Sequence, residues 1–582
     1  MQAYSIWCRR FDDMDRVYQM VKLLPQVALL VFSTLVVQAQ AQSKAPDAGS
    51  IMQGIERDRK PVTPTTPAAP ALAQPETTAL SQNEATVVVK QFTVTGNTLM
   101  DEAALQSVLQ PFANRPLTMA ELQQAADAVV QYYLDQGYLT RTILPKQDVT
   151  EGTVRIQVIE SSFSGAEIES NLEGKRITED RIKNTIAAQI KPGDPMSLKK
   201  LERGLMLADD IPGVNVTGRL AAGTSDLTTG VVLNVSDEPL IYGEAAVDNF
   251  GSYSTGPVRA TLNGTMSGAL KMGDQLSLFT MKTQGIEFAR LGFSLPAGYE
   301  GWRIGTNAST MQYKIVQGPA GKGTSLVLGL DANYPILRSK PDNINYVANL
   351  DKKFFNNSNS LGETTTKYHS LVLSTGLNAS MTDKIQPGGL TSGNLMLSLG
   401  TINLNGSPNQ ADDLATVKAQ GSFQKLKFTA SHTQDITTEL IGFASVAAQV
   451  ASKNLDSSEK FYLGGPLGVR AYPNNEGGGS QGQLMTLELR QKLTRDLVLT
   501  AFYDRGHVTV NKSNDFVGAA NPNQMSYAGA GLQLAWFGPQ NSNVKAIWSR
   551  RMGNNPYPTA SGSDQDGTQK LNRIWFSASI PF

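Results

Sequence analysis

The chain ends in the sequence IWFSASIPF (Ile574–Phe582), in which large apolar and small side chains alternate. Successive side chains of a β-strand point to opposite faces, so this run has one strongly apolar face and one more polar face. The first face carries Ile574, Phe576, Ala578, Ile580 and Phe582, and the second carries Trp575, Ser577 and Ser579. The run therefore predicts a strand that meets an apolar environment on one side.

Similar alternating runs of about ten residues fill the chain from Pro239 to Phe582, separated by Gly, Asn, Asp and Ser. Examples are DQLSLFTMKT, GNLMLSLGTINL and DLVLTAFYD. Strands of this kind without a long apolar run are typical of a transmembrane β-barrel, and roughly twenty residues per strand and connection predict about 16 antiparallel strands. A soluble β-sandwich would alternate in the same way. The number of similar strands, the aromatic last residue and an N-terminal signal sequence favour the barrel.

Composition narrows the possible functions. Lys plus Arg and Asp plus Glu both number 51, a balance that argues against a nucleic-acid binder. The single cysteine, Cys8, excludes a disulfide scaffold and a cysteine metal site. His369, His432 and His507 are far apart and lack metal-ligand spacing, so we interpret them as unrelated polar positions. We expect neither a metal nor a cofactor.

The N-terminal segment has the pattern of a secretory signal. An apolar stretch of signal-peptide length (LLPQVALLVFSTLVV, 23–37) follows Lys22, and Ala39-Gln40-Ala41 gives a small-x-small cleavage pattern. We therefore expect a signal peptide over residues 1–41; a signal anchor is the alternative. The acidic charges in the first nineteen residues are unusual for a signal, so we expect translation to start at Met20.

Two segments of different character follow. Residues 42–60 contain a short helix, predicted over 50–60, in which Ile51 and Ile55 share one face. So short a helix is marginal alone in water and must dock on another element. Residues 61–86 are rich in Pro, Thr and Ala and form a semi-extended linker.

Residues 87–161 and 162–238 repeat one order of elements: a strand, two helices and two closing strands. In the first copy, Thr118 and Glu121 form a capping box that starts the second helix. In the second copy, Ser197 caps the corresponding helix. Such an internal repeat indicates two copies of one small α+β module. Two unrelated α+β domains are the alternative.

This organisation resembles the two-partner-secretion transporters, also called haemolysin secretion/activation proteins, of the POTRA-bearing barrel superfamily. The resemblance covers residues 42–582 and rests on strings in the family's order. They are PDAGSIMQGIERD (46–58), LPKQDVTEGTVRIQVIE (144–160), LERGLMLADDIPGVNVTGRLAAG (201–223), VDNFGSYSTGPVRATL (247–262), GGPLGVRAYPNNEGGGSQG (464–482) and FYDRG (502–506). It implies a plug helix at 42–60, POTRA modules at 87–161 and 162–238, and a barrel at 239–582 with an inward-folded loop at 464–482.

The resemblance also implies a contact that locks this loop to the barrel wall. The loop side would be Val469, Arg470 and Tyr472, and the strand side Phe502, Asp504 and Gly506. From the residues alone, an exposed arginine and a strand-end aspartate are the better interpretation; the resemblance reverses that preference. Asp504→Arg is then expected to impair export, and added Arg470→Asp to restore it partly. The sequence departs from the family at Ala471, where glycine is frequent, and at Ser480, where an acidic residue is frequent.

The function implied by the resemblance is export of one large exoprotein across the outer membrane. The exoprotein would be of adhesin, cytolysin or contact-dependent toxin type, or an iron-acquisition protein. The POTRA modules would recognise the client in the periplasm. Phe576 and Phe582 would form the C-terminal signal read by the barrel-assembly machinery, within outer-membrane lipids. Gly318–Thr324 (GPAGKGT) has Gly323 where a phosphate-binding loop needs Ser or Thr, so we interpret it as an extracellular loop.

Three rival functions remain. Gly478–Gly482 fits the G-x-S-x-G pattern of a hydrolase around Ser480, with His507 as a possible base, but it lies in a glycine-rich loop. We therefore predict no enzyme activity. A barrel-insertion factor of the same superfamily would resemble this chain, although two modules and a plug-like helix favour export. A passive porin would not need periplasmic modules.

Overall fold

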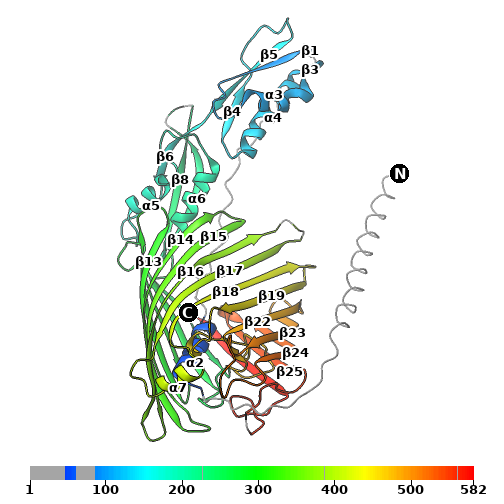
Figure 1. Cartoon of the computed structure of the whole chain (residues 1–582). Coiled ribbons are helices and arrows are strands. Elements are labelled where there is room, and N and C mark those ends of the chain that lie inside the picture. Colours follow the sequence, from blue (N-terminus) through cyan, green and yellow to red (C-terminus); the bar gives the residue numbers. More distant parts are fainter. Residues whose placement is uncertain are drawn as a thin grey trace, which may run out of the picture. The chain divides into compact units, whose positions relative to one another are not determined.

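The computed structural model describes residues 46–59, 86–223, 225, 227–383, 385, 387–559 and 561–582 (Figure 1). The predicted signal peptide and nearly all of the predicted linker lie outside these residues. Within the described ranges, no helix combines the length and the apolar character that a bilayer-crossing helix requires.

Sixteen antiparallel strands close into one barrel, as the alternation predicted (Figure 1). The strands before the long loop are β9 (Ile241–Asp248), β10 (Arg259–Ser267), β11 (Gln275–Lys282), β12 (Ile286–Ala297), β13 (Trp302–Lys314), β14 (Gly321–Arg338), β15 (Asp342–Asn359), β16 (Thr364–Thr382), β17 (Gly389–Asn403), β18 (Gly421–Asp435) and β19 (Leu440–Ala451). Those after it are β22 (Gln481–Lys492), β23 (Leu497–Thr509), β24 (Gln524–Phe537), β25 (Asn543–Arg551) and β26 (Asn572–Pro581). Pairing of β26 with β9, from Ser577↔Asp248 to Pro581↔Glu244, closes the ring.

Exposure alternates along the strands as the sequence does. On β26, Ile574, Phe576 and Ile580 are exposed, whereas Trp575 is buried. On β14, Leu326, Leu328 and Leu330 are exposed and Ser325 and Val327 are buried. The apolar side chains therefore face outward, where a membrane replaces water as the solvent. The expected extracellular loop at 318–324 is shorter than predicted, because Gly321–Thr324 already belongs to β14.

Short elements lie in the connections between barrel strands. They are α7 (Gln410–Ala415), η2 (Ser457–Glu459), β20 (Phe461–Tyr462), β21 (Gly478–Gly479) and η3 (Pro539–Asn541).

The first α+β module has its own apolar core. Its elements are β1 (Thr86–Val89), β2 (Gln91–Thr95), α3 (Glu102–Leu109), η1 (Gln110–Phe112), β3 (Arg115–Thr118), α4 (Met119–Asp135), β4 (Thr140–Ile143) and β5 (Thr153–Glu160). The capping box of Thr118 and Glu121 starts α4, and Leu122, Val129 and Tyr133 are buried in the core. One strand was expected over 87–95; the structure has two, because β1 pairs with β3 and β2 with β5.

The second module repeats this order and has a separate core. Its elements are β6 (Ser162–Ile168), α5 (Glu179–Ala187), α6 (Leu198–Asp209), β7 (Val214–Ala222) and β8 (Thr228–Asp237). Ser197 caps α6 through the backbone amide of Lys200. In both modules a parallel and an antiparallel neighbour flank the central strand, in the orders β2-β5-β4 and β6-β8-β7. This common topology supports the repeat.

Helix α2 (Ala48–Asp58) lies inside the barrel. It begins two residues before the predicted start, because Asp47 and Ser50 form a capping box that the sequence interpretation overlooked. Ile51, Met52 and Ile55 are buried on its apolar face.

Candidate functional site: the loop and the helix inside the barrel

A long connection between β19 and β22, residues 452–480, folds back into the barrel and contains the predicted loop sequence. We call it the inward loop. It is longer than the predicted range of 464–482 because β19 ends at Ala451, and its last two predicted residues belong to β22. The short pair β20–β21 joins its two arms. Leu463, Val469 and Tyr472 of its tip are almost fully buried.

Arg470 at the tip of the inward loop binds Asp504 on β23. The guanidinium Nε donates to Asp504 Oδ2 at 2.8 Å, and Nη2 donates to Oδ1 at 2.8 Å. The backbone amide of Arg470 donates to Oδ2 at 3.1 Å. Arg470 is 5% exposed and Asp504 0%. This bidentate, charge-assisted geometry is the strong form of the arginine–carboxylate contact.

Other groups complete the surroundings of Arg470. Nη1 lies 2.8 Å from Glu488 Oε1 on β22. The guanidinium carbon is 3.5 Å from the centroid of the Phe502 ring, a cation–π distance. The Arg470 carbonyl accepts hydrogen bonds from Ser549 Oγ and from Trp575 Nε1, both at 2.7 Å. Side chains of β22, β23, β25 and β26 thus hold one residue of the loop.

Tyr472 anchors the next part of the tip through its ring. The ring meets that of Tyr527 edge to face at 4.8 Å, and the Arg551 guanidinium lies 4.5 Å from its centroid. Val469 donates its backbone amide to the Leu463 carbonyl at 2.7 Å, so it stabilises the bend of the loop. Of the predicted residues, Val469, Arg470 and Tyr472 therefore all lie in the buried contact.

Two strand glycines make room for the loop. A Cβ on Gly506 would lie 2.4 Å from the side chain of Leu463, and one on Gly529 of β24 would lie 2.5 Å from the Ala471 Cβ. Ala471 itself is not one of the described residues that have a positive φ. The expected difficulty of alanine at this position therefore does not arise, and it is Gly529 that permits its close approach.

Ser480 and His507 do not form a catalytic pair. The Ser480 hydroxyl donates to the Val510 carbonyl at 3.0 Å and accepts from the Leu455 amide at 3.0 Å. The His507 Nδ1 lies 3.0 Å from Ser526 Oγ, a neighbour on β24. His507 alternates with the buried Gly506 and Val508 on β23, so its ring points outward while Ser480 is buried inside. Ser480 thus joins two parts of the backbone where a carboxylate was expected from the family.

A second polar cluster holds the other arm of the inward loop. Glu476 accepts hydrogen bonds from Asn555 Nδ2 at 2.9 Å and from the Gln565 amide at 2.8 Å. Both donors belong to the connection between β25 and β26. Asp564 of the same connection pairs with Arg551 and Arg573.

Helix α2 packs its apolar face against the barrel wall. Ile51, Met52 and Ile55 belong to one buried cluster with side chains of the surrounding strands. Strand members of this cluster include Met281, Phe288, Met311, Tyr313, Val327, Phe355 and Tyr368. The two predicted plug residues, Ile51 and Ile55, are thus in contact with the pore lining.

Polar contacts hold both ends of α2. At its start, Asp47 accepts from Ser457 Oγ of the inward loop at 2.8 Å, and the Ala48 amide donates to Asn357 Oδ1 at 2.8 Å. At its end, Arg57 donates to the Gly464 carbonyl at 3.2 Å, and Asp58 pairs with Arg259 at 2.9 Å. The inward loop therefore contacts both the barrel wall and the helix.

Phe576 and Phe582, predicted as a C-terminal signal, lie on the outer surface and are exposed. The amide of Phe582 donates to the Gly243 carbonyl at 3.0 Å, and its carbonyl accepts from the Gly243 amide at 2.9 Å. These residues are thus part of the seam between the first and last strands.

Several residues of the site were missed from the sequence. Glu488 could have been found, because it shares a face with Thr486 on a strand expected beside Asp504. Trp575 was assigned to the polar face, and its indole N–H is the polar group that bonds the loop. Glu476 and Asp564 lie in irregular segments, where no periodicity indicates a direction.

Comparisons with known proteins agree with this architecture. The ShlB-type POTRA domain matches residues 87–161, and the family described as haemolysin secretion/activation protein ShlB/FhaC/HecB matches residues 228–534. The chain is 24% identical to the heme/hemopexin transporter protein HuxB of Haemophilus influenzae over 76% of its length and 79% of the relative. It is 24% identical to the outer membrane transporter CdiB of Dickeya dadantii over 73% and 76%.

Solved structures show the same fold. CdiB from Escherichia coli aligns with a TM-score of 0.68 and 18% identity, covering 94% of this chain and all of that one. CdiB from Acinetobacter baumannii aligns with a TM-score of 0.61 and 15% identity, covering 98% of both. Because the family match spans more than half of the sequence, the chain belongs to the ShlB/FhaC/HecB family of haemolysin secretion/activation proteins, the outer-membrane transporters of two-partner secretion, with its POTRA domain in the periplasm.

Proposed function

We propose that this transporter recognises a large exoprotein through its POTRA modules and exports it, unfolded, through the barrel without hydrolysing nucleotide. The names of its relatives support a secreted protein as the cargo: HuxB is a heme/hemopexin transporter and HpmB of Proteus mirabilis a hemolysin transporter. The client would be of adhesin, cytolysin or contact-dependent toxin type.

The observation that carries this proposal is the presence of α2 in the barrel interior. A helix with its side chains is about 10–12 Å wide. Once α2 leaves, an extended chain would fit the space it occupied, whereas a domain of about 100 residues has a radius of gyration near 13 Å and would not. Export of an unfolded client is therefore the mode that the interior favours.

The contacts of α2 suit a plug that departs. Hydrogen bonds hold its start, hydrogen bonds and two ion pairs with the wall (Asp58–Arg259 and Glu56–Arg290) hold its end, and its apolar face is short. Arg259, which pairs with Asp58, also pairs with Asp248, so it would keep a partner after departure. A client that binds the open state more tightly would shift the population toward it.

The modules offer edge strands for an unfolded client. The edges of the three-stranded sheets are β2 and β4 in the first module and β6 and β7 in the second. An edge strand can add an extended peptide through backbone hydrogen bonds, without catalytic chemistry. Deleting residues 87–161 should therefore abolish export while the barrel still assembles; unchanged export would refute this role.

The Arg470–Asp504 contact would keep the inward loop against the wall while the plug moves. Nucleotide hydrolysis has no support at 318–324, where a turn runs into β14 rather than into a helix. Folding of the client outside the cell would give the direction of transport. Phe576 and Phe582 would direct the barrel to the assembly machinery.

The deciding experiment is a secretion assay with a very large exoprotein, which we expect a neighbouring reading frame to encode. Co-expression should place that protein in the medium, and omission of the transporter should leave it in the cell. Abundance of other outer-membrane proteins, measured in parallel, should not change. A fall in that abundance with no secretion would instead indicate an insertion factor.

A further inference from the structure

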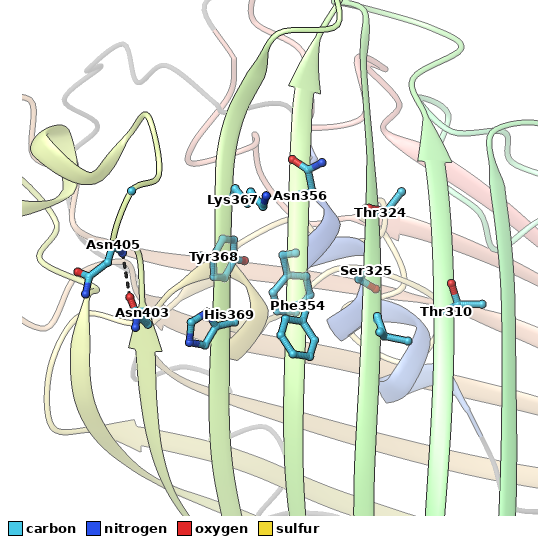
Figure 2. Close-up of a pocket in the computed structure, with 13 residues that line it drawn as sticks. Thr310, Thr324, Ser325, Phe354, Asn356, Lys367, Tyr368, His369, Asn403 and Asn405 are labelled. Carbon is cyan, nitrogen blue, oxygen red and sulfur yellow. Dashed lines mark hydrogen bonds between the residues drawn. The ribbon is translucent and has the colours of Figure 1, made fainter.

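The outer surface of the barrel carries a pocket of mixed polar and apolar lining across β13–β17 (Figure 2). Its volume is about 540 Å³, and Thr324, Asn356, Lys367, His369 and Asn403 contribute to its lining. Leu326 and Phe354 also line it and are exposed. On β13 and β14, exposure alternates so that even-numbered residues point away from the interior. The pocket therefore opens toward the membrane side.

An aromatic cluster shows where this pocket lies along the membrane normal. Trp302 stacks on Tyr334 at 4.7 Å and meets Tyr346 at 6.3 Å. Tyr334 and Tyr346 are register partners on β14 and β15, and Trp302 directly precedes Arg303, the partner of Asn333 on β14. The chain enters β9 directly from the periplasmic modules, and successive barrel strands run in opposite directions. β13 therefore begins on the periplasmic side, and Trp302 marks that end. Such aromatic girdles lie at a membrane interface.

The polar residues of the pocket on β14 and β15 lie at the opposite membrane interface. Thr324 and Asn356 are register partners, each ten residues along its strand from Tyr334 and Tyr346. Ten residues span about 34 Å along a strand, or about 26 Å along the membrane normal for the usual tilt. The apolar band of such barrels is about 25 Å tall. The pocket therefore lies where the outer-leaflet headgroups begin.

Three lysines that form no salt bridge among the described residues gather at this edge, although one of them, Lys314, lies near enough to Glu287 for their charges to interact. Lys314 and Lys322 are direct register partners of β13 and β14, and both are exposed. Lys367 is the partner of Asn356, next to Thr324. None of the ion pairs among the described residues includes these three lysines, whereas nearby Lys282 is paired with Glu287. Like charges placed directly opposite destabilise a sheet, so an anion between them would relieve a built-in repulsion.

We propose that this surface binds the phosphorylated sugar headgroup of an outer-leaflet glycolipid of the lipid A type. We call it the glycolipid face and define it by Lys314, Lys322, Lys367, Asn356, Leu326 and Phe354. The lysines bind the phosphates, and Asn356 with Thr324 and Asn403 bonds sugar hydroxyls. Leu326 and Phe354 lie one row deeper and pack against the acyl chains. A free phosphate would use only the lysines, so the apolar row selects the lipid.

The test uses the purified full-length protein and native mass spectrometry with added bisphosphorylated lipid A. Wild type should retain the lipid. Because each basic residue near a membrane surface is worth about fivefold in affinity, K314Q/K322Q should bind roughly 25-fold more weakly and K367Q about fivefold. The matched control is K271Q/K340Q, which removes two lysines from turns at the periplasmic ends of hairpins and should bind as wild type does.

Two further arms separate the lipid from other anions. Lipid A stripped of its phosphates should bind the wild type far more weakly, and inorganic phosphate at millimolar concentration should not displace the intact lipid. Equal retention by K314Q/K322Q and K271Q/K340Q would overturn the proposal, as would equal binding of the phosphate-free lipid. The phosphate-free arm needs only the wild type, so it decides even if a variant fails to insert.

Discussion

Arg470 gives Asp504 three hydrogen bonds, two from its guanidinium and one from its own backbone amide. The contact therefore fixes both the side chain and the backbone of the loop tip. Thr486 Oγ1 also donates to Asp504 at 3.0 Å, and Glu488 binds the remaining guanidinium nitrogen. The aspartate is fully satisfied, and the arginine lies between two carboxylates.

The first prediction concerns the energetic coupling of this pair. Removing one partner of a buried ion pair leaves the other charge unpaired and typically costs about 3–5 kcal/mol. Arg470→Gln and Asp504→Asn should each lower barrel stability by about this amount, and the double variant by less than their sum. The measurement is the midpoint of denaturant-induced unfolding in detergent.

The exposed pair Lys282–Glu287 is the matched control for this cycle, with side chains 72% and 67% exposed. Its coupling should not exceed about 1 kcal/mol, as is usual for solvated pairs. Additive losses at Arg470 and Asp504 would show that the two residues do not stabilise the barrel through each other.

The second prediction concerns reversal of the charges. Asp504→Arg should abolish export, because it places two arginines against each other. Addition of Arg470→Asp should restore less than the sequence suggested, because the new aspartate would lie next to Glu488. Adding Glu488→Gln should increase the recovery. Export of the partner exoprotein is the readout. Equal recovery with and without Glu488→Gln would contradict the proposed repulsion between the new aspartate and Glu488.

The barrel was predictable because alternation of period two is a local signal that every strand carries. The Arg470–Asp504 contact was not available from spacing, since the loop and β23 meet only through the tertiary fold; the resemblance supplied it. The start of α2 was missed because Asp47 was not considered as a cap, although Asp47 and Ser50 have the required spacing. Trp575 was misjudged because alternation shows which face a side chain occupies and not what it bonds.

The third prediction orders two glycine substitutions. A Cβ on Gly529 would meet the Cβ of Ala471, which is fixed to the backbone, whereas one on Gly506 would meet the end of the flexible Leu463 side chain. Gly529→Ala should therefore cost more stability than Gly506→Ala, within the 1–3 kcal/mol usual for overpacking. Gly264→Ala is the control, because its Cβ would meet nothing within 4 Å. The unfolding midpoint measures all three, and an inverted order would contradict the assigned contacts.

The fourth prediction concerns the plug. A Cβ on Gly49 would lie 2.6 Å from Ser457 Oγ and 2.7 Å from the Tyr368 hydroxyl, so Gly49→Val should prevent α2 from seating. Single-channel conductance should then rise toward that of a variant lacking residues 46–59. Gln53→Val, at a partly buried position of the same helix, introduces the same side chain, lowers helix propensity where Gly49→Val raises it, and should still stay closed. An unchanged conductance in Gly49→Val would show that α2 does not limit the pore.

Glu160 joins the end of β5 to the segment between β2 and α3 in the first module. It accepts hydrogen bonds from the amides of Thr98 and Leu99, both at 2.8 Å, and from the hydroxyls of Thr98 and Tyr133. Burial raises the pKa of Glu160, but these hydrogen bonds lower it by more, so its pKa lies below the usual value. The ionised form therefore holds this part of the module together.

The fifth prediction follows from the sign of this shift. A carboxyl group whose folded pKa is lowered stabilises the fold above its unfolded pKa of about 4.3, and the stabilisation is lost as the pH falls through the folded pKa. At pH 7, Glu160→Gln should reduce the hydrogen-exchange protection of the Thr98 and Leu99 amides by roughly tenfold or more, since a hydrogen bond to a charged group is worth about 1.5 kcal/mol or more. The difference from wild type should shrink at acidic pH. Glu151→Gln, at an exposed turn of the same module, should change nothing, and a difference that persists unchanged at low pH would show that the charge is not responsible.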